Sequence, residues 1–463
     1  MIMKKIFFST TQIMTGILIM TASLTSCKKL IEIPSNPPSS ITQKEQFADS
    51  ATTMTAVAGI YVYNAGIGFA YSDARLTYNT SLSADELSSA LNSDNQQFYN
   101  YTLTPLNSGA EALWTTHYQS IYQVNAVLNG VTNSVSLSAT FKKQIAGEME
   151  VVRALYYFNL VNLYDGVPLV TQTDYNQTDR LPKATTAAIY TQIMTDLADA
   201  QKKLAVTYPS SGRARPNLYT AMGLLAKVNL YQGKWQYAYN EADSVIQSGN
   251  YSLEPNPKNV FLDGSSEAIW QIPSNQGYYG VADAQNFVPN YSGAIPGYLL
   301  TTSLLNAFET GDKRFQDWVA SDASSGNTLY YPYKYKNVVA STTPVEDQMV
   351  LRLAELYLIR AEAAAHLNNL TQALADVNSI RTRAGLAPST ASTETGVLNA
   401  IMQERRIELF CEWGNRWYDL KRTGTAAQVL GAEKTGFNAN SALYPIPQSQ
   451  ILLNNQLKQN PGY

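Results

Sequence analysis

The chain has 463 residues, with 33 Lys plus Arg against 36 Asp plus Glu and a formal net charge of -3. Its length allows roughly two or three average domains or one elaborate domain, and the near balance of charge excludes nucleic acid as an expected partner because no basic surface can match a phosphate backbone. Only 15% of the residues are charged, whereas 31 are Tyr. The surface is therefore expected to be polar, weakly charged and rich in half-buried rings with exposed hydroxyl groups.

The start of the chain has the pattern of a bacterial lipoprotein signal. Lys4 and Lys5 form a basic start, residues 6–24 carry no charge, and the sequence LTSC ends at Cys27. Export requires a basic start, an apolar middle and small residues before the cleavage point. A transmembrane helix is the alternative, but Ser, Thr and Gln interrupt the run, and a span needs about 20 mostly apolar residues. We therefore predict a signal peptide over residues 1–26 and a lipid anchor on Cys27, outside the cytoplasm.

Residues 27–46 are expected to form a flexible tether. Pro34, Pro37 and Pro38 oppose a helix there, and the neighbouring Ser residues keep the backbone solvated. The tether would join the anchor to one domain that comprises residues 47–463.

Apolar residues at helical spacing predict four helices in the first half of that domain. The helices cover residues 47–63, 114–128, 141–164 and 185–205. Between the first two, residues 64–105 lose the periodicity and are rich in Gly, Asn, Ser and Tyr, which predicts irregular loops. Loops of this length inside a compact body usually have a function.

Two later segments resemble each other. When residues 217–249 are set beside residues 350–385, Ala226 falls on Ala361, and each segment reads as two helices joined by a tight turn. Small residues would let the helices approach closely, and large ones such as Trp235 would fill the gaps, which is typical of tetratricopeptide-like packing. Generic helical hairpins are the alternative.

Residues 251–335, between the two hairpins, contain many aromatic residues without a regular pattern. They are predicted to be irregular loops as well. The expected fold class is therefore mostly α, with tetratricopeptide-like helical hairpins and long, irregular, aromatic-rich loops.

The densest motif is QERRIELFCEWGNRWYDLKR, residues 403–422. Apolar residues such as Ile407, Phe410 and Trp417 recur at steps of three and four, which predicts a helical stretch with one strongly apolar face. Its acidic and basic residues nearly cancel, which favours ion pairs between helices over substrate binding. Cys411, inside this stretch, is predicted to be a buried small hydrophobe.

No pattern for catalysis, a metal or a cofactor stands out. His117 and His366 are the only His residues, and neither has a His or Cys nearby at metal-ligand spacing. Asp85 and Glu86 are adjacent, so their side chains point apart, whereas glycoside hydrolysis needs two carboxyl groups that face each other across a sugar. We expect no enzyme activity, no metal and no cofactor.

Five motifs in order make the chain resemble the SusD/RagB family. They are RALYYF with VPLV (153–170), LRLAELYLIRAEA (351–363), the run at 381–386, the block at 404–422, and YPIP with NPGY (444–463). The resemblance covers nearly the whole chain after Cys27. It implies a surface-exposed outer-membrane lipoprotein that acts with a SusC-like TonB-dependent transporter and most often carries an oligosaccharide.

The residues themselves fit a sugar ligand, because flat rings pack on C–H faces and amides hydrogen-bond to hydroxyl groups without charge. The family motifs are scaffold motifs, so the predicted binding residues come from the position of the loops alone. Rings would stack on the sugar and Asn286 would hydrogen-bond to it. The predicted ligand-binding residues are Tyr71, Phe98, Tyr99, Tyr278, Tyr279, Asn286 and Phe287.

Two other functions stay open at this point. A member of the same family could bind peptides instead of glycans. A helical-repeat adaptor would bind only proteins and would have an uninterrupted concave groove, which the long aromatic loops argue against.

Overall fold

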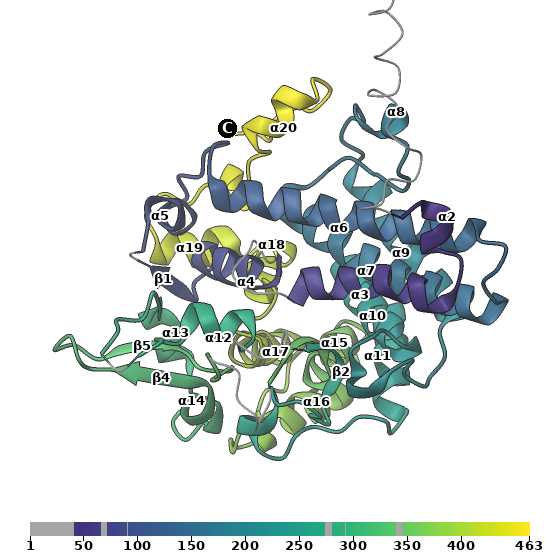
Figure 1. Ribbon diagram of the computed structural model, residues 1–463. Coiled ribbons are helices and arrows are strands. Elements are labelled where there is room, and N and C mark those ends of the chain that lie inside the picture. Colours follow the sequence, from purple (N-terminus) through teal and green to yellow (C-terminus); the bar gives the residue numbers. More distant parts are fainter. Residues whose placement is uncertain (1–40, 66–71, 90, 274–279, 292, 339–345) are drawn as a thin grey trace, which may run out of the picture.

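A computed structural model describes residues 41–65, 72–89, 91–273, 280–291, 293–338 and 346–463. The predicted lipidation site Cys27 and the predicted binding residues Tyr71, Tyr278 and Tyr279 lie outside these ranges. Within them the protein is mostly helical, as predicted (Figure 1). No helix in these ranges combines the length and the apolar character needed to cross a membrane.

Long helices make up the centre and right of the molecule in Figure 1 and pack mainly against their neighbours in sequence, as the helical-repeat prediction requires. The four helices predicted in the first half and both hairpins are confirmed, with bounds that differ by a few residues. The long helices are α3 (Ser50–Ala65), α6 (Ser108–Asn133), α7 (Ala139–Tyr164), α9 (Thr186–Lys203), α10 (Leu218–Tyr231), α11 (Trp235–Gln247), α15 (Leu353–His366), α16 (Leu370–Arg383) and α17 (Glu394–Glu408).

Many of the short elements lie on the left of the molecule, whereas α2, α8 and β2 lie on the right (Figure 1). The described strands form three antiparallel pairs: β1 (Leu87–Ser89) with β3 (Tyr298–Leu300), β2 (Ala268–Pro273) with β6 (Asp347–Arg352), and β4 (Val319–Asp322) with β5 (Leu329–Pro332). The short helices are α2 (Gln43–Gln46), α4 (Ser72–Ser83), α5 (Ser93–Asn100), α8 (Tyr175–Thr178), α12 (Ala282–Phe287), α13 (Thr302–Ala307), α14 (Lys313–Trp318), α18 (Asn415–Arg422), α19 (Ala426–Glu433) and α20 (Gln448–Leu453).

The prediction that residues 64–105 are irregular is wrong, because α4, β1 and α5 lie there. Helix α4 is buried but polar, so it has no apolar stripe that would produce a helical period. Its hydroxyl groups bond back into the helix: Thr80 Oγ1 donates to the carbonyl of Leu76 at 2.5 Å, and Ser83 Oγ donates to that of Asn79 at 3.0 Å. Residues 251–335 likewise contain four strands, three short α-helices and the 3-10 helix Pro257–Asn259 among the described residues.

The end of the predicted tether is also structured. Thr42 and Glu45 form a capping box that starts α2. Gln43 Nε2 donates to Asn129 Oδ1 of α6 at 2.9 Å, so this helix is attached to the body. The folded region therefore begins a few residues before position 47.

The block at residues 403–422 does not form one helical stretch. Helix α17 ends at Glu408 and α18 begins at Asn415, and between them Cys411 and Trp413 have φ of 50° and 49°, with Gly414 at 75°. Three left-handed residues so close together turn the chain back on itself. Cys411 is buried, as predicted.

The ion pairs predicted for this block are confirmed, and they lie in the core. Glu408 accepts hydrogen bonds from Arg352 Nη1 at 2.5 Å, from Arg314 Nη1 at 3.1 Å and from Arg383 Nη2. Glu412, in the turn, is bound by Lys334 Nζ at 2.5 Å and by Arg352 Nε at 2.9 Å. All six residues are buried. The turn therefore serves to direct two carboxylates at buried cations.

Candidate functional site

The two segments predicted to supply the ligand face meet in the fold. Strand β1 pairs with β3, so that Leu87 lies opposite Leu300 and Ser89 opposite Tyr298. Helix α12 packs on α4, next to this pair of strands (Figure 1). We refer to the surface formed by α4, α5, β1, α12 and β3, with the connection from α12 to β3, as the loop face.

Tyr298 is at the centre of the packing beneath the loop face. Its ring stacks on Tyr78 with centroids 5.0 Å apart, and the edge contact with Phe287 has centroids 5.6 Å apart. Asn95 Nδ2 donates to the Tyr298 hydroxyl at 3.0 Å. Burial raises the pKa of both Tyr78 and Tyr298, so both phenols stay neutral and act only as hydrogen-bonding groups near neutral pH.

Two of the predicted binding residues are core residues instead. Phe98 is 1% exposed and makes an edge contact with Tyr444, with centroids 5.2 Å apart. Phe287 is 4% exposed and packs on Tyr298. Neither ring has a face left for a ligand, so their prediction as stacking platforms is wrong. Both support the loop face from beneath.

The other two predicted residues inside the described ranges differ from each other. Asn286, on α12, is exposed, and its Nδ2 donates to the carbonyl of Ala282 at 2.8 Å. Tyr99, on α5, is half-buried, and its ring centroid lies 4.4 Å from Lys434 Nζ, beyond α19. Burial lowers the pKa of Lys434 to about 7. Asn286 is open to a ligand, whereas Tyr99 is already engaged on the side of α19.

Three exposed apolar residues on the loop face were not predicted. Leu91, Tyr291 and Ile295 are each at least 58% exposed. Leu91 lies close to Gly297, where an added Cβ would come within 2.7 Å of Leu91 Cδ1, and Ser89 Oγ donates to the Gly297 carbonyl at 2.8 Å. The only signal in the sequence is the presence of single apolar residues in otherwise polar loops.

Three acidic residues near the loop face, Asp85, Glu86 and Asp283, are buried. Asp85 accepts hydrogen bonds from Arg416 Nε at 2.7 Å and Nη2 at 2.6 Å. Glu86 accepts one from Ser81 Oγ at 2.7 Å, and burial raises its pKa to about 7. Asp283 of α12 accepts from Gln348 Nε2 at 3.0 Å, and burial raises its pKa to about 7. These three carboxyl groups are buried, whereas Asp94 of α5 and Arg75 of α4 are only partly buried.

Fold and surface together define a helical-repeat protein that presents an aromatic, weakly charged face built from short elements. The chain belongs to the SusD family: the model of that family matches residues 159–463, and a second model, described as starch-binding and associating with the outer membrane, matches residues 35–230. The predicted family is thereby confirmed. Its members are starch- and glycan-binding proteins associated with the outer membrane.

Similar proteins cover the whole chain. SusD-like protein P38 of Formosa agariphila is 25% identical over 520 aligned positions, which include 100% of both chains. The crystal structure of a SusD superfamily protein from Bacteroides vulgatus has a TM-score of 0.80 at 22% identity and covers 90% of this chain and 100% of its own, which establishes the fold. A laminarin binding SusD-like protein has a TM-score of 0.74 at 25% identity, with coverage of 90% and 100%.

Proposed function

We propose that the protein is a lipid-anchored protein of the outer surface of the outer membrane that binds a neutral oligosaccharide on its loop face and delivers it to a SusC-like TonB-dependent transporter. Membership of a glycan-binding family and the similarity to a laminarin binding protein support the class of ligand. In this proposal residues 1–26 are the signal peptide, Cys27 carries the lipid, and the helical body binds the ligand without converting it.

The observation that carries the proposal is the composition of the loop face. Tyr291, Leu91, Ile295 and Asn286 are all exposed on the short segments that build the loop face, and Asp85, Glu86 and Asp283 nearby are buried. A pyranose has flat C–H faces that pack on rings and aliphatic groups, and hydroxyl groups that bond to amides. A charged ligand would meet no opposite charge among these four side chains. Tyr71, Tyr278, Tyr279 and, at the edge, Tyr99 remain proposed ligand residues.

Replacing Tyr291 by Ala is expected to weaken binding of a neutral glycan by about 1–3 kcal/mol, the range for loss of an aromatic stacking platform. Because Tyr291 is largely exposed, the melting temperature should stay unchanged. Calorimetric titration of the intact protein with laminarin, starch fragments and other neutral glycans, and in parallel with peptides, measures this. Tyr279→Ala should behave in the same way.

Tyr237→Ala is the matched control, because Tyr237 is a similarly exposed Tyr on α11. It should bind like wild type. Saturable binding of peptides with no response to any glycan would establish the peptide-binding alternative instead. No response to either ligand class would favour the adaptor.

Replacing Cys27 by Ser is expected to release the protein from the membrane fraction and to abolish labelling by an alkyne-tagged fatty acid, because the thiol that would carry the lipid is gone. Fractionation and labelling of intact cells measure both effects. Cys411→Ser is the matched control and should keep label and location, because Cys411 is buried in the folded protein.

Co-purification from membranes of the same cells tests the proposed transporter partner. The wild-type protein should co-purify with a large β-barrel protein of the SusC type. Unchanged labelling of Cys27→Ser would contradict the proposed anchor, and purification without any such barrel would contradict the proposed partner.

A further inference from the structure

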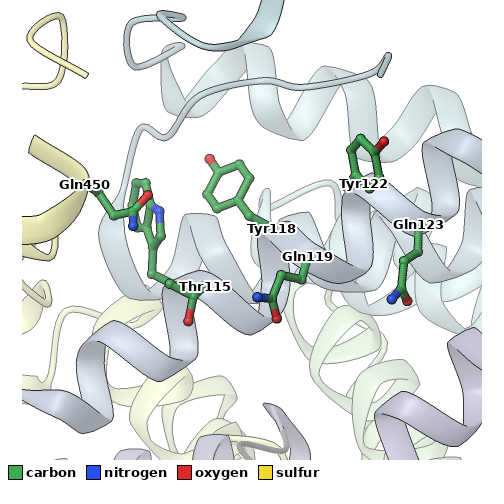
Figure 2. A pocket seen from close by; sticks show the side chains of 7 residues that line it. Thr115, Tyr118, Gln119, Tyr122, Gln123 and Gln450 are labelled. Carbon is green, nitrogen blue, oxygen red and sulfur yellow. The ribbon is translucent and has the colours of Figure 1, made fainter. Parts of the chain in front are cut away.

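A second surface with the chemistry of a sugar site lies along α6, outside the loop face. It is an open groove of about 640 Å³ between one side of α6 and Gln450 of α20 (Figure 2). That volume is in the range of pockets that hold small ligands. The residues that line this groove belong to α6 and α20, and none belongs to a helix or strand of the loop face.

The floor of this α6 groove is a row of rings. Trp114, Tyr118 and Tyr122 follow one another at steps of four, so they share one side of α6 and are spaced by about 6 Å along its axis. The first two rings have centroids 5.0 Å apart, and Tyr118 and Tyr122 rise from the same side of the helix in Figure 2. Trp114 is buried and supports the row from beneath, whereas Tyr118 and Tyr122 reach the surface. A linear oligosaccharide repeats at a similar spacing, so two successive sugar rings could pack on these two tyrosines.

The first two rings are held in place, and the third is free to meet a ligand. Trp114 is buried and makes an edge contact with Tyr164, with centroids 5.0 Å apart. The Tyr118 hydroxyl donates to the carbonyl of Pro168 at 2.8 Å. Tyr122 is 58% exposed. Such a preorganised floor lowers the entropy that binding would lose.

The polar groups of the groove are neutral. They are the hydroxyl of Thr115 and the amides of Gln119, Gln123 and Gln450, and no Asp, Glu, Lys or Arg of the described part of the chain lines the groove. Each amide offers both donors and acceptors, as a sugar hydroxyl requires. Gln123 Oε1 is buried without a hydrogen-bond partner among the described residues.

We propose that the α6 groove is a second binding site for a neutral oligosaccharide. Phosphates, nucleotides and acidic peptides would find no cation there, and a purely apolar segment would bury the amides unsatisfied. A neutral sugar needs no cation, and its hydroxyl groups can hydrogen-bond to the amides while its C–H faces pack on the rings. The ligand class rests on the proposed function, whereas the location rests on the groove alone. Two sites on one molecule would let a long glycan bind more tightly than either site does.

The test uses the intact protein and two neutral hexasaccharides, laminarihexaose and maltohexaose, in calorimetric titrations. Tyr291→Ala serves as the background because it weakens the loop face and leaves the groove intact. In that background, Tyr122→Ala should reduce the remaining affinity at least about tenfold. Tyr122→Phe, which keeps the ring, and Tyr237→Ala, which lies outside the groove, should not.

Each outcome decides between the two proposals. If Tyr122→Ala binds both sugars as tightly as its parent while Tyr291→Ala weakens binding, the groove is not a site and the loop face stands. If wild-type protein binds neither sugar, both proposals are wrong for these ligands. Because Tyr122 is exposed, an unchanged melting temperature should accompany the loss of affinity, and a lowered one would indicate a structural role instead.

Discussion

Replacement of Glu408 by Gln is expected to destabilise the protein by about 3–5 kcal/mol, the range for breaking a buried ion pair from one side. Glu408 receives hydrogen bonds from Arg314, Arg352 and Arg383, and all four residues are buried. The amide keeps the shape but removes the charge, which leaves three guanidinium groups without their shared partner. Urea unfolding followed by circular dichroism measures the loss.

Glu394→Gln is the control, because it makes the same change in the same helix at a side chain that is half exposed. Its carboxylate lies 3.9 Å from His366 Nδ1, a contact that is an ion pair only when the imidazole is protonated, and it should contribute less than about 1 kcal/mol. Similar losses in the two variants would show that the buried network contributes no more than a surface pair. A stable, soluble Glu408→Gln variant with unchanged unfolding would contradict the prediction outright.

Acid should destabilise the wild-type protein, as the Glu408→Gln substitution is expected to do. Burial alone would raise the pKa of Glu408, but Arg383, Arg352 and Arg314 lower it well below its ordinary value. A depressed carboxyl pKa contributes stability that is complete above the pKa of the unfolded chain and is lost as pH falls through the folded value. The stability that the Glu408 carboxylate contributes should therefore disappear only in strong acid. The Glu408→Gln variant should lack this contribution.

Replacement of Trp417 by Ala is expected to destabilise the protein by about 3–5 kcal/mol by creating a cavity in the core. The side chain is fully buried, stacks on Tyr444 with centroids 6.2 Å apart, and meets the edge of Phe437. Burial of this face was predicted from the spacing of apolar residues at 403–422. Thermal and urea unfolding measure the effect.

Trp235→Ala is the matched control, because Trp235 is only half-buried at the start of α11, where it stacks on His366 with centroids 4.0 Å apart. It should lose less stability than Trp417→Ala. Wild-type melting of Trp417→Ala would refute the prediction, because a core cavity of this size cannot be silent.

The sequence predicted the scaffold well where helices are rich in apolar residues. In α6, α9, α11 and α16 these residues recur with the helical period because one side of the helix is buried, whereas α7, α10 and α15 are buried nearly all round and are apolar on most sides. It failed for α4, because that helix is buried with polar residues whose hydroxyl groups bond within the helix, so no hydropathy period appears. It also missed the turn at Cys411 to Gly414, where three-step spacing continues although the backbone leaves the helix.

The candidate site was predictable in its location and less so in its residues. Residues 64–105 and 251–335 do come together, through β1 and β3 and through α4 and α12. An aromatic residue in a segment without periodicity can face either way, however, and Phe98 and Phe287 face the core. Hydroxyl-free rings gain most from complete burial, which is a reason to prefer Tyr over Phe when ligand residues are sought in such loops.

The pairing of distant segments has a consequence for how the chain is made. Strand β1 needs β3, more than 200 positions later, and the carbonyl of Leu82 accepts a hydrogen bond from Lys434 Nζ, 352 positions later. Contacts of such high sequence separation form slowly. The amino-terminal part of the loop face therefore cannot mature until the ribosome has nearly finished translation. In the export that we propose for this protein, these contacts would form only after the chain has left the cytoplasm.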